Sequence, residues 1–248
     1  QQLAALDGLK ELTLTTNGSQ LARLAQPLKV AGLDRINISL DSLQPERFLQ
    51  ITRTGQLADV LAGIQAAQDA GFERIKLNCV ILRGRNDDEI LPLVNFARQQ
   101  CLDLAFIEEM PLGVITEHQR AQTYISNDEI RQLIDGQYPL LAATDNTGGP
   151  ARYYRMSDSN TRIGFISPHS HNFCESCNRV RVTVEGRLLL CLGNEHSADL
   201  KQPLRDFPND DQVLINTLFN ALTLKPERHH FNLQEQPQIV RFMNMTGG

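Results

Sequence analysis

The sequence has no surplus of positive charge, no internal repeat and no apolar run long enough to span a membrane. Its 29 aspartate and glutamate residues outnumber its 24 lysine and arginine residues, which gives a formal net charge of -5. Proteins that bind nucleic acid generally carry a basic surplus, because their lysines and arginines replace condensed counterions. We therefore expect neither a general nucleic-acid binder nor a membrane protein, and we expect any anionic ligand to meet a local basic cluster.

Cysteine is scarce, and no secretory signal peptide is visible. The chain contains five cysteines, and 41% of its residues are hydrophobic while 21% are charged. This composition is typical of a chain that buries a substantial core, as one large domain or as two smaller ones. Few cysteines without a signal peptide favour a reduced, cytoplasmic protein. We interpret Cys79 and Cys101 as small core residues.

The other three cysteines lie close together in the sequence. Cys174 and Cys177 form a C-x-x-C pair, and Cys191 follows them. Thiolates suit zinc and iron–sulfur clusters about equally well, and a disulfide or free thiols are further alternatives. A structural zinc normally takes four protein ligands, so a histidine would have to complete it; the candidates are His169, His171 and His196. An iron–sulfur cluster on three cysteines would leave one iron open to a substrate atom.

The segment between these cysteines predicts a β-hairpin. Residues 179–190 alternate with period two and are interrupted once, at Glu185-Gly186, which is a two-residue turn signal. Counting back from this turn, rung by rung, brings Val180 opposite Cys191. The hairpin would therefore direct three sulfurs into one small volume.

The first 110 residues alternate between predicted strands and predicted helices, which is typical of a parallel sheet or barrel. The strands are predicted over residues 11–15, 35–40, 74–81 and 103–107, and helices over 57–70 and 87–100. Gly32 and Gly71 fall just past helix ends, where a left-handed cap is favoured. We expect an α/β fold, with a partial TIM-type barrel of about four strand–helix units followed by a mixed α+β region that carries the three cysteines.

Each predicted strand is apolar on one face and polar on the other. In the second strand, Ile36 and Ile38 oppose Asn37. The same alternation places Thr15 and Lys76 on the polar faces of the first and third strands. Barrel strands turn their apolar face outward to the helices, so the polar residues would line the interior and hold a ligand. An antiparallel sheet with one wet face is the weaker alternative, because helical segments separate the strands.

Further polar residues cluster where the predicted strands end, at positions 16–18, 41 and 108–110. The carboxyl ends of barrel strands are where active sites form. Lys76 would supply a cation there, and a lysine between buried neighbours needs an anionic partner. Arg179 and Arg181 leave the C-x-x-C turn on one face of the hairpin. Together they form a candidate phosphate clamp, although solvated surface arginines are the ordinary alternative.

Several of these segments resemble one protein family. The matching segments are residues 14–18, 36–41, 76–78, 106–110 and 173–181, with the terminal pair Gly247-Gly248. In order and spacing they resemble the molybdenum-cofactor biosynthesis protein A family, the radical S-adenosylmethionine GTP 3′,8-cyclases. The resemblance implies one 4Fe–4S cluster in a partial barrel, which cleaves S-adenosylmethionine, and a second 4Fe–4S cluster in the C-terminal region, which binds GTP through its open iron.

The resemblance also implies roles for individual residues. Cys174, Cys177 and Cys191 match the ligands of the second cluster. The residues that resemble GTP contacts are Thr15, Lys76, Arg179, Val180 and Arg181, and those that resemble S-adenosylmethionine contacts are Ser39 and Met110. Gly247 and Gly248 resemble the glycine pair that reaches into the active site in the family. Taken alone, two terminal glycines would be interpreted as a flexible tail.

The reaction implied by the resemblance begins with hydrogen abstraction from C3′ of the GTP ribose. The carbon radical then attacks C8 of guanine, and reduction gives (8S)-3′,8-cyclo-7,8-dihydroguanosine 5′-triphosphate. The downstream cyclic pyranopterin monophosphate synthase acts on this product. The resemblance further implies a homodimer in the full-length form, with GTP as the partner and no nucleic acid or membrane.

One feature of the family is missing from these residues. Family members hold the cluster that reduces S-adenosylmethionine in a C-x-x-x-C-x-x-C loop, and this sequence contains no such triplet. A protein positions its cofactor while the cofactor supplies the hard chemistry, so no 5′-deoxyadenosyl radical can form without that cluster. We therefore expect an N-terminally truncated, inactive piece of a cyclase that retains GTP and second-cluster binding.

Two domains are predicted, a partial radical S-adenosylmethionine barrel over residues 1–112 and a cluster and GTP-binding region over 113–248. Within the second, we expect a helical connection followed by strands near 151–155 and 162–166. The alternative function is a zinc-stabilised, non-catalytic binding module. A hydrolase using Glu108-Glu109 or His229-His230 has little support, because no nucleophile with an adjacent base is visible.

Overall fold

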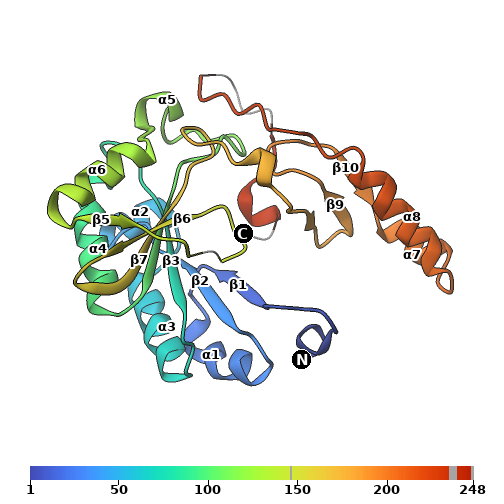
Figure 1. The fold of residues 1–248 in the computed structure, drawn as a ribbon, viewed down its shortest axis with the longest axis horizontal. Helices are drawn as coiled ribbons and strands as arrows, with labels where there is room; N and C mark the ends of the chain where they lie inside the picture. The colour runs from blue at the N-terminus through green and yellow to red at the C-terminus, as the bar shows by residue number, and fades with distance from the viewer. Residues whose placement is uncertain (146, 235–238, 247–248) are drawn as a thin grey trace. The chain divides into compact units, whose positions relative to one another are not determined.

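The computed structural model describes residues 1–145, 147–234 and 239–246, which divide into two compact units (Figure 1). The first unit comprises residues 1–109 and 123–170, and the second comprises residues 110–122 and 171–248. The predicted domain boundary after residue 112 stays a prediction, because a division into compact units does not show which segments fold independently. Among the described residues, no helix combines the length and apolar character needed to cross a membrane.

The first unit is built on a seven-stranded, mostly parallel sheet. Its strand order is β1-β2-β3-β4-β7-β6-β5. Strands β1 to β4 and β7 pair in parallel, whereas β6 and β5 extend the sheet with antiparallel pairing. The strands are β1 (Thr13–Thr16), β2 (Arg35–Ser39), β3 (Ile75–Val80), β4 (Asp103–Ile107), β5 (Leu140–Ala142), β6 (Arg152–Met156) and β7 (Ser159–Ile166). The predicted α/β class with a parallel sheet is confirmed.

Helices cover one face of this sheet, with α1 beside α3 (Figure 1). The helices are α1 (Leu21–Val30), α2 (Pro45–Thr52), α3 (Leu57–Asp69), α4 (Ile90–Gln99) and α6 (Asn127–Gln137), with short 3-10 turns η1 (Leu3–Ala5) and η2 (Asp87–Glu89). Ile36, Ile38 and Leu77 are fully buried in the core that the strands share with these helices. Because strand side chains alternate, the polar residues of β2 and β3 face the other side of the sheet.

Two details of this unit follow from backbone chemistry. Gly32 and Gly71 have φ values of 94° and 77°, so the predicted left-handed caps are confirmed. Strand β1 begins two residues later than predicted, because the N–H of Leu12 donates to the Asp34 carboxylate at 2.7 Å. The register then places Thr15 of β1 opposite Asn37 of β2.

The predicted hairpin forms in the second unit, from β8 (Arg181–Val182) and β9 (Arg187–Leu189). Its turn is longer than predicted. The N–H of Thr183 donates to the carbonyl of Arg187 at 2.9 Å, which leaves three residues in the turn. Gly186, the last of them, has a φ of 82°. Three-residue hairpin loops end on a left-handed residue, which favours glycine at this position.

The extra turn residue shifts the register of the hairpin by one. Arg181 lies opposite Leu189 in the observed ladder. Continued by one rung, the same register brings Val180 opposite Leu190. The predicted pairing of Val180 with Cys191 is therefore wrong.

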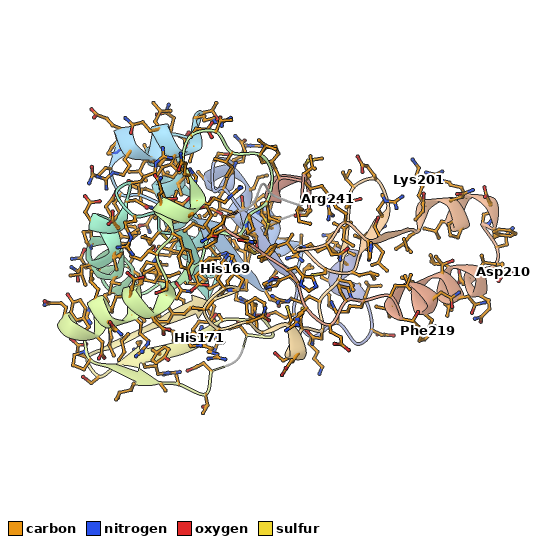
Figure 2. The ribbon with its side chains drawn as sticks, turned by 90° about the horizontal axis from the view of Figure 1, so that it is seen from above. His169, His171, Lys201, Asp210, Phe219 and Arg241 are labelled. Carbon is orange, nitrogen blue, oxygen red and sulfur yellow. The ribbon has the colours of Figure 1, made fainter. Side chains whose placement is uncertain are left out.

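The rest of the second unit packs on this hairpin. Strand β10 (Ser197–Asp199) pairs antiparallel with β9. Helices α7 (Lys201–Asp206) and α8 (Asp211–Leu222) follow, and Figure 2 labels Lys201, Asp210 and Phe219 on this helical pair. The shorter elements are η3 (Cys174–Ser176), η4 (Met243–Met245) and α5 (Arg120–Thr123), whose last residue belongs to the first unit. A small core forms from Leu188, Leu190, Leu200 and Ala221.

Candidate functional site

The polar face of the sheet in the first unit carries buried cations. Arg35 and Lys76 are 6% and 8% exposed, and Asn37 lies buried beside them. Burying a charge is unfavourable unless it is paired or hydrogen-bonded. Arg35 meets this condition, because its guanidinium makes a two-pronged ion pair with Glu11 at 2.8 and 2.7 Å.

Lys76 differs from Arg35 because no described residue forms a hydrogen bond or ion pair with its ammonium group. Burial, and after it the positive charge of Arg35, lower the pKa of Lys76 to about 8, while Asp103 acts in the opposite direction. The predicted anionic partner is therefore not supplied within the described protein. A desolvated, unpaired cation is a group that an anionic ligand can neutralise.

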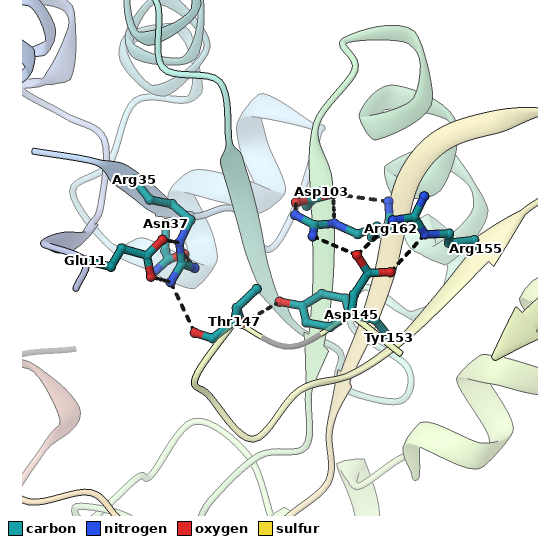
Figure 3. A network of polar contacts seen from close by, with 9 residues as sticks. All are labelled: Glu11, Arg35, Asn37, Asp103, Asp145, Thr147, Tyr153, Arg155 and Arg162. Carbon is teal, nitrogen blue, oxygen red and sulfur yellow. Dashed lines mark hydrogen bonds and ion pairs between the residues drawn. The ribbon is translucent and has the colours of Figure 1, made fainter. Parts of the chain in front are cut away.

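A chain of hydrogen bonds runs from Arg35 through Asn37 to the edge strand; Figure 3 shows Arg35 and Asn37 with Glu11 and Thr147. Arg35 donates to Oδ1 of Asn37 at 3.3 Å, and Nδ2 of Asn37 donates to Oγ1 of Thr15 at 3.2 Å. Arg35 also donates to the carbonyl of Thr147, at 3.4 Å. Thr15, a predicted GTP contact, is exposed on the outermost strand.

A second polar network secures the loop that precedes β6 (Figure 3). Arg162 pairs with Asp103 and, at 3.3 Å, with Asp145. Asp145 also pairs with Arg155 at 2.8 Å, and the two guanidinium groups lower its pKa to about 2. These charged side chains pair with one another, so the network holds Asp145 against the sheet.

Three of the residues near the strand ends are Ser39, Asp41 and Met110. Ser39, at the end of β2, and Met110, after β4, are both half-buried. Asp41 accepts a hydrogen bond from the N–H of Val80 at 2.8 Å, but burial raises its pKa to about 6. The structure thus places Asp41 two residues beyond Ser39, in a poorly solvated position.

Glu108 is a structural carboxylate. It is 1% exposed and accepts backbone N–H donors from Asn127, His169 and Ser170 at 3.1, 2.9 and 3.0 Å. Its lone pairs are occupied by these donors, so the hydrolase alternative through Glu108 is not supported. The Nε2 atom of His169 lies 2.9 Å from the carbonyl oxygen of Glu109.

In the second unit, the three predicted cluster ligands are half-buried. The Sγ atom of Cys174 lies 3.5 Å from the backbone nitrogen of His229, and that of Cys177 lies 3.6 Å from the guanidinium of Arg179. Burial acts to raise the pKa of Cys177, but the hydrogen bonds and charge of Arg179 bring it below its usual value. Donors around a sulfur stabilise the thiolate, which is the form that binds metal.

The pKa of Cys191 depends on the charges of the other two cysteines. Burial raises the pKa of this thiol, and the neighbouring thiolates of Cys174 and Cys177 raise it further, against a hydrogen bond from Gly193. Within the parts of the chain that the structure describes, no group of three His, Cys, Asp or Glu residues is arranged to hold a metal ion, so a cluster on these cysteines stays a prediction.

Lys225 is a residue near these sulfurs that sequence reasoning missed. Its ammonium donates to the carbonyls of Arg179 and Leu190 at 2.9 and 2.6 Å and lies 4.0 Å from the Sγ atom of Cys177. It thereby joins the two segments that carry Cys177 and Cys191. A lone lysine after a helix gives no sequence signal for such a role.

The remaining predicted GTP contacts also lie in the second unit. Arg181 is half-buried, and burial together with the charge of Arg179 lowers its pKa. Arg179 stacks over the ring of Phe173, with its guanidinium carbon 5.1 Å from the ring centre. Val180 is 41% exposed. Gly247 and Gly248 lie outside the described residues.

Comparison with known proteins places the whole chain in one family. Residues 1–97 match the radical SAM superfamily, and residues 102–231 match the family described as Molybdenum Cofactor Synthesis C. A GTP 3′,8-cyclase of Pseudomonas putida (strain W619) is 63% identical over 100% of this chain and 74% of its own length. One from Marinobacter nauticus is 59% identical over 97% of this chain and 73% of its length. The crystal structure of Streptococcus suis SuiB, at 14% identity and a TM-score of 0.53, covers 93% of this chain and 59% of that chain, and shares the fold alone. This chain therefore belongs to the GTP 3′,8-cyclase family.

Proposed function

We propose that this chain provides the GTP-binding part of a radical S-adenosylmethionine GTP 3′,8-cyclase in molybdenum-cofactor synthesis. Family membership leads us to expect a 4Fe–4S cluster and S-adenosylmethionine. The finer assignment is a 4Fe–4S cluster on Cys174, Cys177 and Cys191. The observations that carry it are the half-burial of the three thiols and the N–H donors near the sulfurs of Cys174 and Cys177. When bound, such a cluster offers one iron, free of protein ligands, to a substrate atom.

The residues of the chain would bind and orient the nucleotide. In the first unit we assign GTP contacts to Thr15 and Lys76, and in the second to Arg179, Val180 and Arg181. The support is chemical: Lys76 is a buried cation without a partner among the described residues, and Arg181 is a desolvated one. Such cations neutralise phosphate charge most effectively where water is excluded.

The other assignments follow the family pattern. We assign S-adenosylmethionine contacts to Ser39 and Met110 and an active-site role to Gly247 and Gly248. The fold would be a partial barrel over residues 1–112 with a cluster-binding region over 113–248. The full-length form would be a cytoplasmic homodimer whose product passes to cyclic pyranopterin monophosphate synthase. Because the 248 residues contain no C-x-x-x-C-x-x-C triplet, we expect no turnover from this chain alone.

Iron and sulfide analysis with electron paramagnetic resonance tests this proposal. The chain is purified or reconstituted without oxygen and measured before and after GTP is added. We expect about four irons and four sulfides per chain and a reduced-cluster signal that GTP perturbs. One zinc, no sulfide and no response to GTP would support the binding-module alternative instead.

Arginine variants test the GTP contacts separately from the cluster. Arg179→Ala or Arg181→Ala should weaken GTP binding by on the order of 1 to 3 kcal/mol for each lost charge-assisted contact. Arg205→Ala is the matched control, because Arg205 is exposed on α7. Unchanged GTP affinity in both variants, with iron content retained, would remove these arginines from the proposed site.

A further inference from the structure

The hydrogen bonds around Asn37 have only one chemically possible direction. A guanidinium can only donate, so the side-chain atom of Asn37 that faces Arg35 must be the carbonyl oxygen. The amide nitrogen then faces Thr15, and because an amide N–H₂ can only donate, the threonine hydroxyl oxygen must accept. This direction follows from donor and acceptor chemistry alone.

The position of Arg35 is fixed independently of Asn37. Glu11 accepts two hydrogen bonds from Arg35, and the carbonyl of Thr147 accepts a third. The guanidinium is 6% exposed as part of a buried residue, so it cannot turn into solvent without losing this set. The hydrogen bonds that Arg35 donates to Glu11, and the negative charge of Glu11, raise the pKa of Arg35, which keeps it a permanent donor. Asn37 therefore faces a fixed donor on one side.

The hydroxyl of Thr15 is left with one unused proton. Its oxygen accepts from Asn37, and no other described residue hydrogen-bonds to it. Thr15 is exposed, and it points to the polar side of the sheet, as Asn37 and Lys76 do. With one lone pair engaged by Asn37, the hydroxyl keeps its O–H and a second lone pair, and toward a phosphate oxygen, which can only accept, it donates the O–H.

We propose that Glu11, Arg35 and Asn37 are positioning residues that make Thr15 a hydrogen-bond donor to GTP. The nucleotide atom at Thr15 is then an acceptor, such as a phosphate or ribose oxygen or an unprotonated ring nitrogen. The inference rests on the proposed GTP site, and it adds the direction of the hydrogen bond and three residues that set it. In this proposal the three residues act on the nucleotide through Thr15.

We call the hydrogen bonds that run from Arg35 through Asn37 to Thr15 the relay. Asn37→Asp reverses the direction of its last hydrogen bond. A carboxylate still accepts from Arg35, but it now accepts from Thr15 as well, so the threonine proton turns inward and its lone pairs face the nucleotide. We expect GTP affinity to fall about tenfold or more, as for Thr15→Val, while Thr15→Ser keeps it. The matched control is Thr13→Val, a change of the same kind on the same strand, which should leave GTP affinity unchanged.

A double-mutant cycle separates the relay from the added negative charge. GTP affinity is measured by titration calorimetry on the cluster-loaded chain for Thr15→Val, Asn37→Asp and both together. The charge acts with or without Thr15, whereas the relay acts only through it, so we expect the double variant to lose clearly less than the sum of the single losses. Additive losses would overturn the relay and leave the GTP site standing. Failure of the unmodified chain to bind GTP would overturn the proposed function and the relay with it.

Discussion

At the scale of single residues, Lys76 shows a conflict between stability and binding. Its folded pKa of about 8 lies below the usual lysine value of 10.5, so folding disfavours its charged form. Protonated Lys76 therefore lowers the free energy of unfolding below about pH 8, and this penalty disappears as the pH rises from there toward the unfolded pKa. Chemical denaturation at pH 7 should find Lys76→Met more stable than the unmodified chain, by on the order of 1 to 3 kcal/mol.

The same variant should bind GTP more weakly. The unmodified chain loses the charge of Lys76 above about pH 8, so its GTP affinity should fall between pH 7 and pH 9, whereas that of Lys76→Met should stay level. Titration calorimetry at the two pH values measures this difference. Lys10→Met is the control, because Lys10 is exposed. Weaker binding in Lys76→Met with the same pH slope as the unmodified chain would show that the charge is not the cause.

Asp41 gives a second pH prediction of the opposite sign. Burial raises its pKa from 3.8 to about 6, so the folded chain holds this proton more tightly than the unfolded chain. Stability contributed by the protonated form is present at low pH and is lost as the pH rises from about 4 to 6. Burial, and after it the charges of Asp41 and Glu89, raise the pKa of the Cys79 thiol on β3. Asp41→Asn should therefore be more stable than the unmodified chain at pH 7 and should lose the pH slope, while the exposed Asp59→Asn keeps it. An unchanged slope in Asp41→Asn would assign the pH dependence elsewhere.

Sequence alternation predicted the buried, polar-face position of Lys76, because side chains of a strand point to alternate faces. It did not predict that Lys76 would lack a partner or that Arg35 would pair with Glu11. Glu11 lies just before β1 and Arg35 begins β2, so the parallel register of the two strands creates this contact. Long-range pairings of this kind depend on register, which a single sequence does not encode locally.

At the scale of elements, Gly186 determines the register of the hairpin. Its φ of 82° favours glycine, and a Cβ added there would lie 2.8 Å from the Cβ of Lys201. Gly186→Ala should lower the free energy of unfolding by more than Gly148→Ala, at which φ is 70° and no atom lies within 4 Å. The backbone term common to both is about 1 kcal/mol, and the contact with Lys201 adds to it only at Gly186. Equal losses in thermal or chemical denaturation would show that the contact carries no penalty.

Lys225 joins the two arms of this hairpin beside the cysteines. Lys225→Met keeps much of the side-chain volume but removes both hydrogen bonds to backbone carbonyls. We expect the reconstituted variant to retain less iron than the unmodified chain, because the segments that carry Cys177 and Cys191 are no longer held together. Lys201→Met, an exposed lysine on α7, is the control for lost charge. Iron retention equal to that of Lys201→Met would exclude this positioning role.

At the scale of the whole molecule, the two units differ in how much apolar surface supports them. The first has an extended core in which strands and helices pack along the whole sheet. The core of the second, within its described residues, consists of Leu188, Leu190, Leu200 and Ala221. On α8, Ile215 and Phe219 are 39% and 67% exposed, so this helix buries only part of its apolar surface. Period-two and helical patterns predicted the first unit well, because its elements are long and regular. They predicted the second unit less well, because its strands have only two or three residues and the length of the turn sets the hairpin register.

This difference leads to a prediction about removal of the cluster. A small core rarely stabilises a fold alone, and metal ligation can supply the missing free energy. Hydrogen–deuterium exchange on the chain with and without its cluster should show loss of protection in β8, β9 and β10 when iron is removed. Protection in β2, β3 and β4 should stay the same, because their backbone hydrogen bonds are buried in the larger core. Uniform loss across both units would mean that the chain unfolds as one cooperative body. Unchanged exchange everywhere would mean that Leu188, Leu190 and their neighbours suffice without the cluster, and that its role is confined to the nucleotide.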